Sequence, residues 1–291
     1  MSLFDQLVNV ALRARADLSS LRPVVEKELL HHDILREMSA AGLLAGLTFV
    51  GGTCLRACYG SARLSEDLDF TGGSDFRRDD LAELATTLTG RLKSRYDLPV
   101  RVSEPVKIGG NVSTWKLVIE TRPGQKSLPA QRINLDICAI PSHDPRPMML
   151  RNLYSVDLGT SGLILQAQSR EEVLADKVVA LALRENRIKN RDLWDIAWLL
   201  QQGVEIPLHL IPLKIRDHKR EKAGFIVALE ARLAGLRGQP DMRADFIKEM
   251  RRFLPAATVH DTIDKEPYWS YLTQIATELG QQVVVALKST P

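Results

Sequence analysis

The segment FVGGT at residues 49–53, followed by RLSEDLDF at residues 63–70, is the most informative part of the sequence. In the first segment an apolar strand ends in two glycines, and Thr53 is expected to cap a helix that begins near Cys54. Glycines allow a backbone to approach phosphate closely, a helix N-terminus attracts anions, and the threonine adds a hydroxyl donor. Because Gly-Gly turns before helices are common, this segment indicates a phosphate site only together with others.

The second segment places two acids on one face of a strand. Side chains alternate along a strand, so Asp67 and Asp69 point one way while Leu68 and Phe70 point the other. Neighbouring carboxylates repel each other unless a cation lies between them, and Mg²⁺ prefers carboxylates combined with phosphate oxygens and water. The alternative is an exposed strand with two solvated acids. The Gly-Gly-Thr sequence upstream favours the metal site.

A third acid occurs on a later strand, Arg132–Ile140. Apolar side chains alternate along this strand, and Asp136 faces the opposite way. If the strand pairs beside Ser65–Phe70, Asp136 joins the other two acids. A third carboxylate can help to hold a catalytic metal and can accept the proton of an attacking hydroxyl. The alternative is a half-exposed acid without a catalytic role.

The rest of the sequence divides into a mixed front part and a helical rear part. Helical periodicity covers residues 1–45, Asp80–Tyr96 and everything after about residue 160. Further strands are expected at Pro99–Val106, Thr114–Thr121 and Arg132–Ile140, with a hairpin turn at Gly109-Gly110-Asn111 and a loop at Pro141–Pro147. We therefore expect an α+β fold, with a mixed-sheet domain over residues 1–160 and a helical domain over residues 161–291.

Composition limits the classes of function. The net charge of +3 permits a nucleic-acid partner without requiring one. No stretch of about 18 apolar residues occurs, so no membrane span is expected. The N-terminus lacks the basic start, apolar run and small-residue cleavage site of a secretory signal. Three cysteines without such a signal indicate a reducing compartment, so we expect a cytoplasmic protein.

The run G-G-T…R-x-S-x-D-x-D resembles the nucleotidyltransferase superfamily that shares the DNA polymerase β fold. Two later segments, EEVLADK at residues 171–177 and KNRDLWD at residues 189–195, are similar to the AbiEii/AbiGii family of abortive-infection nucleotidyltransferase toxins. The resemblance spans roughly residues 35–200. It implies a polymerase β-like nucleotidyltransferase core followed by a helical domain.

Together, the pattern and the resemblance define a set of candidate site residues. The expected metal ligands and catalytic acids are Asp67, Asp69 and Asp136, with Lys177 as a further catalytic residue. The nucleotide is expected to contact Gly51, Gly52, Thr53, Arg63, Ser65, Lys177, Arg191, Asp192 and Asp195. Ser65 is also a plausible regulatory position, since a phosphate added there would compete with the nucleotide tail.

The helical-domain residues also have structural interpretations. Lys177 lies on an apolar helix face, where burial of its ammonium requires an anion such as a nucleotide phosphate. Alternatively, its head reaches solvent while its stem packs on the face. Arg191 and Asp195 are four residues apart and can simply pair. The resemblance instead places Asp192 and Asp195 near the lysine, closing the nucleotide pocket.

The resemblance implies a toxin that moves a nucleoside monophosphate from a nucleoside triphosphate to the 3′ end of an RNA, with tRNA as the expected acceptor, in a two-metal Mg²⁺ site. It also implies a cognate antitoxin encoded nearby. The basic segment 214–222 is either an RNA contact or a solvated helix face. Two alternatives remain: an enzyme of the same fold that acts on a small molecule or a protein hydroxyl, and a non-catalytic nucleotide- or RNA-binding module.

Overall fold

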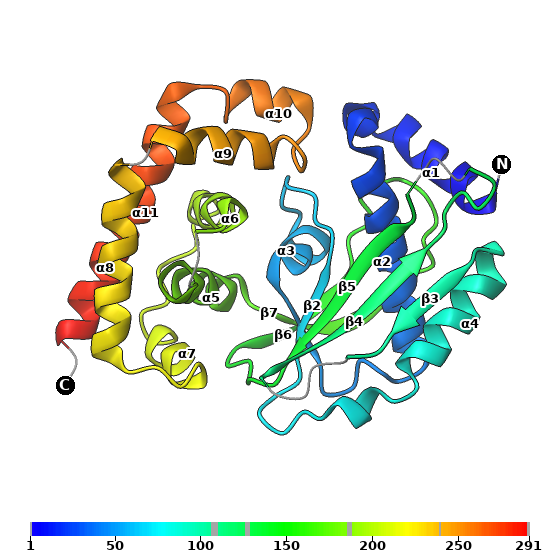
Figure 1. The fold of residues 1–291 in the computed structure, drawn as a ribbon, viewed down its shortest axis with the longest axis horizontal. Coiled ribbons are helices and arrows are strands. Elements are labelled where there is room, and N and C mark those ends of the chain that lie inside the picture. The colour runs from blue at the N-terminus through cyan, green and yellow to red at the C-terminus, as the bar shows by residue number, and fades with distance from the viewer. Residues whose placement is uncertain (1, 106–109, 126–128, 185–187, 239, 290–291) are drawn as a thin grey trace. The chain divides into compact units, whose positions relative to one another are not determined.

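The computed structural model describes residues 2–105, 110–125, 129–184, 188–238 and 240–289. The chain forms two compact units, Met1–Gln168 and Ser169–Pro291. The first unit combines helices with a sheet and the second is helical, so the expected α+β fold class is confirmed (Figure 1). The boundary expected after residue 160 precedes the last strand, β7 (Ile164–Gln168), which belongs to the sheet of the first unit.

The described part of the first unit contains one seven-stranded mixed sheet in the order β3-β4-β5-β2-β1-β7-β6. Its other strands are β1 (Thr48–Val50), β2 (Leu68–Thr71), β3 (Val100–Ser103), β4 (Val112–Ile119), β5 (Gln131–Cys138) and β6 (Pro145–Met149). Strand β2 is antiparallel to β1 and parallel to β5. The strands expected before and after the hairpin turn are therefore confirmed, whereas Gly109 of that turn lies outside the described residues.

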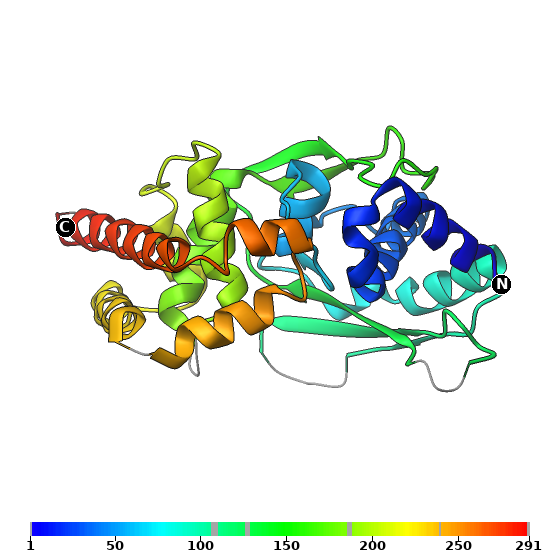
Figure 2. The same cartoon turned by 90° about the horizontal axis from the view of Figure 1, so that it is seen from above.

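Helices cover one face of this sheet. The helices of the first unit are α1 (Leu3–Ala14), α2 (Arg22–Ala40), α3 (Gly51–Tyr59) and α4 (Leu84–Tyr96). Helices α2 and α4 pack against each other and against β5 and β3, respectively, on the same side of the sheet (Figures 1 and 2). Burial alternates along β5, with Ile133, Leu135 and Ile137 buried and Asp136 partly exposed. The apolar face therefore forms the core, and the acids lie on the other face.

Two local expectations are wrong. The predicted loop at residues 141–147 overlaps strand β6 (Pro145–Met149). Prolines at 145 and 147 interrupt the usual strand pattern, but β6 is an edge strand, where a missing N–H can face away from the sheet. Helix α3 begins at Gly51 rather than near Cys54, and its N-cap residue, Val50, is extended and provides no side-chain cap.

The second unit consists of helices in its described residues. They are α5 (Arg170–Leu183), α6 (Asn190–Gln201), α7 (Ile211–Asp217), α8 (Lys222–Gly238), α9 (Pro240–Met250), α10 (Ala256–Asp261) and α11 (Glu266–Ser289). Ser169 caps α5 by accepting a hydrogen bond of 3.0 Å from the Glu172 N–H. Helix α5 packs against α6, α7 and α8 (Figure 1). Within the described ranges, every helix is too short or too polar to cross a lipid bilayer.

Candidate active site

The start of α3 lies directly against two of the predicted site residues. Gly51 has a φ of +75°, and a Cβ placed on it would lie 2.7 Å from Oδ2 of Asp69. A Cβ on Gly52 would lie 2.2 Å from Nη2 of Arg63 and 3.3 Å from Oγ of Ser65. The positive φ requires glycine at Gly51, and a side chain at Gly52 would displace the Arg63 guanidinium. The turn therefore brings the helix N-terminus beside one acid and one buried guanidinium.

Thr53 has a different local role from the one expected. It lies inside the first turn of α3 rather than at its cap, and its hydroxyl donates a hydrogen bond to the backbone carbonyl of Asp67. This bond ties α3 to the residue that precedes β2. A hydroxyl that serves this bond does not donate to a phosphate at the same time. Contact between Thr53 and a nucleotide stays a prediction, and its backbone N–H is the remaining donor.

Two of the three acids lie side by side on neighbouring strands. Asp69 on β2 and Asp136 on β5 are register partners in a parallel pair, so their side chains leave the same face of the sheet. The condition attached to Asp136 in the sequence, that its strand lies beside the Asp69 strand, is therefore met. Oδ1 of Asp136 is buried and has no hydrogen-bond partner among the described residues. Such an atom is costly without a donor or a cation.

Asp67 lies one residue before β2, and its carboxylate turns toward β5. Its Oδ1 accepts a hydrogen bond of 2.9 Å from the backbone N–H of Asn134. Burial raises the pKa of Asp67 above its ordinary value, and the negative charges of Glu66 and Asp136 raise it further against the opposing effects of Asn134 and Lys27. The charged form of Asp67 is therefore disfavoured here unless a cation is nearby.

The arrangement of donors can be compared with the needs of Mg²⁺. Among the described residues, no three His, Cys, Asp or Glu side chains are close enough to share one metal ion. Mg²⁺ usually takes only one or two protein carboxylates, with substrate phosphates and water in the other positions. Asp69 and Asp136, with the unpartnered Oδ1 of Asp136, fit that pattern. Direct ligation by Asp67 stays a prediction.

Helix α2 positions the segment that leads into the acids, and no local sequence pattern indicates this. Glu28 accepts hydrogen bonds from the Ser65 backbone N–H at 3.0 Å and from Arg56 Nε at 3.2 Å. Lys27 forms a 2.8 Å ion pair with Glu66. From the sequence alone, an acid at this place in α2 would be interpreted as solvent-exposed. The contacts of Glu28 become apparent only when α2 is placed against residues 61–66, the segment that Glu28 helps to hold.

The remaining residues of this segment are buried. The side chain of Arg63 is 3% exposed, and its Nη1 donates to the Leu64 carbonyl at 3.0 Å. Ser65 is also buried. Arg63 therefore places a fixed positive charge behind the glycine turn, and an anion bound at that turn would feel its field at low dielectric.

In the helical unit, the predicted residues form one ion cluster. Nζ of Lys177 lies 2.6 Å from Asp192 and 2.8 Å from Asp195. Asp192 also pairs with Arg184 at 3.1 Å. The proximity of Asp192 and Asp195 to the lysine is therefore confirmed. The anions that neutralise Lys177 are carboxylates of the same unit, so its burial alone does not require a phosphate.

Arg191 and the basic segment are also placed by the structure. Arg191 pairs with Glu249 at 3.2 Å and lies over the ring of Phe253, so the alternative pairing of Arg191 with Asp195 is wrong. In the basic segment, Lys214 is fully buried and forms a 2.5 Å ion pair with Glu172. Lys214 is therefore a structural residue, while the basic residues that follow it up to residue 220 are exposed.

A mixed sheet with two acids on adjacent strands, facing a glycine-rich helix start, defines a nucleotidyltransferase. The chain belongs to the AbiEii nucleotidyltransferase toxin family of type IV toxin–antitoxin systems, whose family model matches residues 33–273. It is therefore a nucleotidyltransferase toxin, and membership of a toxin–antitoxin family implies an antitoxin partner.

A solved structure agrees on the fold. MenT4, a nucleotidyltransferase toxin of Mycobacterium tuberculosis H37Rv, is similar with a TM-score of 0.62 and 15% identity, over 96% of this chain and 93% of that one. At this identity the likeness concerns the fold alone. JHP933 of Helicobacter pylori has a TM-score of 0.41 and 17% identity, over 90% and 94% of the two chains, and we base no argument on it. No curated protein matches in sequence.

Proposed function

We propose that this protein uses Mg²⁺ and a nucleoside triphosphate to transfer a nucleoside monophosphate to the 3′ end of an RNA, with tRNA as the favoured acceptor. The observation that carries the proposal is the register pairing of Asp69 with Asp136, in which Oδ1 of Asp136 is buried without a partner. A buried carboxylate oxygen without a hydrogen bond, beside a second carboxylate, destabilises the fold unless a cation binds there. The pair is therefore suited to binding a divalent cation.

The chain's own residues supply the other parts of the reaction. The N-terminus of α3, with its glycine turn, offers backbone N–H groups to the phosphate tail, and the buried Arg63 adds positive charge behind it. Asp69 and Asp136 would hold Mg²⁺, which neutralises phosphate charge during in-line displacement. Asp136 accepts the proton of the attacking 3′ hydroxyl as the new O–P bond forms. The bond from the α-phosphorus to the β-phosphate oxygen breaks, and pyrophosphate leaves.

Lys177 is included as a further catalytic residue because of its place in the family pattern. Its ammonium is already neutralised by Asp192 and Asp195. A phosphate would therefore have to replace one of these carboxylates, or the lysine would act by holding them in place. The variant Asp192→Asn separates these roles: weaker nucleotide binding supports the positioning role, whereas unchanged or tighter binding supports direct contact.

The cellular setting is part of the same proposal. Among the described residues, Cys54, Cys58 and Cys138 form no disulfide, and the first two are buried. Cysteines without disulfides agree with a reducing compartment, so we assign the toxin to the cytoplasm, where nucleoside triphosphates, Mg²⁺ and tRNA are present. The antitoxin is expected to be encoded beside it.

The test is a transfer assay with α-labelled nucleoside triphosphates, Mg²⁺ and total tRNA. Wild-type protein should label RNA, and Asp136→Asn should lower the rate about 10³-fold, because it removes both a metal ligand and the proton acceptor. The matched control is Asp79→Asn, since the Asp79 side chain is 89% exposed and the chemical change is identical. Chelation of Mg²⁺ should stop transfer.

Other outcomes would select the alternatives. Label that appears only on protein, or only when a small hydroxyl compound is added, indicates an enzyme of the same fold with another acceptor. Nucleotide binding without transfer to any acceptor indicates a non-catalytic module. If Asp136→Asn transfers as fast as wild type, the assignment of the acidic pair is wrong even when RNA is the acceptor.

A further inference from the structure

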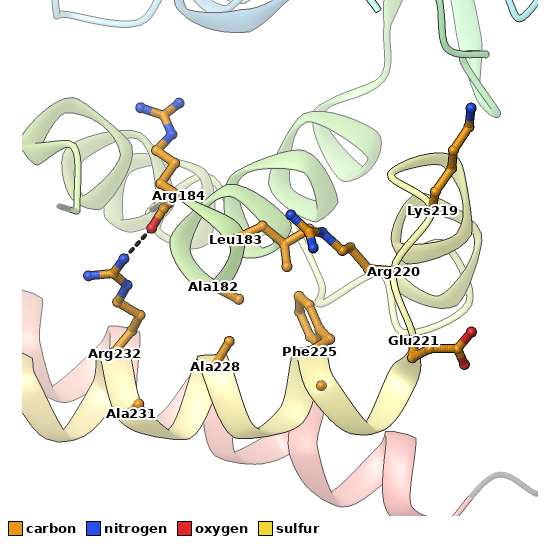
Figure 3. Close-up of a pocket in the computed structure, with 11 residues that line it drawn as sticks. Ala182, Leu183, Arg184, Lys219, Arg220, Glu221, Phe225, Ala228, Ala231 and Arg232 are labelled. Carbon is orange, nitrogen blue, oxygen red and sulfur yellow. Dashed lines mark hydrogen bonds between the residues drawn. The ribbon is translucent and has the colours of Figure 1, made fainter. Parts of the chain in front are cut away.

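A cleft in the helical unit carries most of its charge as arginine and lysine. It lies between the end of α5, the connection from α7 to α8, and α8 as far as Arg232, and it has a volume of about 610 Å³ (Figure 3). Among the described residues, four basic ones line it, Arg184, Lys219, Arg220 and Arg232, against one acid, Glu221. The volume lies within the range of clefts that take a ligand of nucleotide size.

The floor of the cleft is apolar and is opened by small side chains. Gly224, Ala228 and Ala231 lie along one side of α8, opposite Ala182 of α5. The ring of Phe225 projects from α8 toward α5 and is 1% exposed (Figure 3). Because the other side chains are short, this part of the cleft is lined by small apolar groups. The apolar face of a base can pack against such groups.

One of the four charges is placed to meet an anion, whereas Arg184 is already paired with Asp192. Figure 3 shows the guanidinium of Arg220 reaching across the cleft toward Leu183, while the carboxylate of Glu221 points away from it. Arg220 is exposed, and its guanidinium has no ion-pair or hydrogen-bond partner within the ranges that the structure describes. At the other end of the cleft, Arg232 donates a hydrogen bond to the Arg184 carbonyl. A guanidinium without a local acid is suited to bidentate contact with phosphate.

We propose that this cleft docks a single-stranded segment of RNA, with a phosphate on Arg220 and a neighbouring base on the apolar floor. The inference rests on the proposed function, because it takes the acceptor to be RNA, but it concerns residues outside the acidic site. A guanidinium for the phosphate beside an apolar surface for the base combines two contacts that bind single-stranded nucleic acid. An acidic polypeptide would use the charges but leave the floor empty.

The test measures binding without nucleotide or Mg²⁺, so it does not depend on catalysis. A fluorescein-labelled single-stranded RNA of about 12 nucleotides is titrated against the full chain, and anisotropy is recorded at several salt concentrations. Arg220→Glu should weaken binding about tenfold and reduce the salt dependence by about one phosphate contact. The control is Lys265→Glu, which makes the same charge change at an exposed residue between α10 and α11.

A second variant tests the floor without changing charge. Ala231→Phe puts a ring into the cleft from an exposed position on α8, and it should also weaken binding about tenfold while the melting temperature stays near that of wild type. Polyglutamate is added as a competitor. If it displaces the RNA at equal charge concentration, or if the Lys265 variant loses as much affinity as the Arg220 variant, the proposal is overturned.

The two proposals fail in different ways. If the Arg220 and Ala231 variants lose RNA binding but wild type transfers no label to RNA, the docking cleft is supported and the proposed reaction is ruled out. If wild type transfers label to RNA normally and both variants keep the same RNA binding and the same KM for RNA, the docking cleft is ruled out and the reaction stands.

Discussion

At the scale of single residues, the glycine turn gives the sharpest prediction. Gly51→Ala should abolish transfer, because the backbone has a φ of +75° and the new Cβ would lie 2.7 Å from Oδ2 of Asp69. The strain costs about 1–2 kcal/mol, and relief requires moving the acid. The measurements are kcat in the transfer assay and the free energy of unfolding.

A matched glycine provides the control. Gly90 lies inside α4 (Leu84–Tyr96), and a Cβ there would meet nothing within 4 Å. Gly90→Ala should keep full activity and raise the free energy of unfolding by about 0.5–1 kcal/mol, because glycine is a poor helix residue. Full activity in Gly51→Ala would contradict the close approach of α3 to the acids.

Single residues of the site differ in how well the sequence predicts them. Spacing and alternation predict Asp69 and Asp136 on the face of the sheet opposite the core, since those patterns depend only on the period of a strand. Asp67 lies before β2, and a metal-binding role for the three acids stays a prediction. That Asp136 keeps a buried oxygen without a partner, and that Thr53 bonds to the Asp67 carbonyl, follow from neighbours distant in the sequence. No local pattern contains that information.

At the scale of elements, a buried ion pair joins α7 to α5. Lys214 and Glu172 both have fully buried side chains, and Asp176 lies 3.1 Å from the lysine. Burial lowers the pKa of Lys214, but the charges of Asp176 and Glu172 outweigh that effect, so the net shift is upward. The pair is therefore charged, and each partner depends on the other.

This pair predicts a non-additive mutational effect. Lys214→Met should destabilise the protein by about 3–5 kcal/mol, because Glu172 is left buried and uncompensated. The double variant Lys214→Met/Glu172→Leu should recover most of that loss, since apolar side chains of similar volume replace both charges. Chemical denaturation of the wild type and of both single and double variants measures the coupling. A double variant as unstable as Lys214→Met would show that packing, not charge, causes the loss.

Elements also differ in how well the sequence predicts them. Ser169 caps α5 and Gly203, with a positive φ, follows the end of α6, and such residues are typical at helix ends because capping is a local hydrogen-bond requirement. Local patterns do not predict strand β6, because its prolines are tolerated only at a sheet edge. Which strands lie at an edge depends on the order of the whole sheet, and that order is not encoded in any one segment.

At the scale of the whole molecule, two buried histidines predict acid sensitivity. Burial, reinforced by the nearby charges of His32 and Lys27, lowers the pKa of His31 to about 3. Burial and then the charge of Arg56 lower the pKa of His32 to about 4. The ordinary value is 6.5, so between about pH 4 and 6.5 the unfolded chain binds protons that the folded chain does not.

Stability should therefore be highest above pH 6.5 and fall as the pH drops below it. The slope is up to about 1.4 kcal/mol per pH unit for each histidine. Urea denaturation at several pH values across this window measures it. The double variant His31→Gln/His32→Gln should show a smaller difference between neutral and acidic pH than wild type. An equal difference in both proteins would assign the acid sensitivity to other groups.

The sequence by itself determined the class of fold, the two compositional parts of the chain, the glycine turn and the identity of the acids, because these depend on periodicity and on short-range spacing. The tertiary structure alone decided that Asp69 and Asp136 are register partners, that Glu28 holds the segment before the acids, and that Lys177 is neutralised by Asp192 and Asp195. Each of these facts joins residues that are far apart along the chain, and their proximity is set by strand order and helix packing, which are properties of the whole fold.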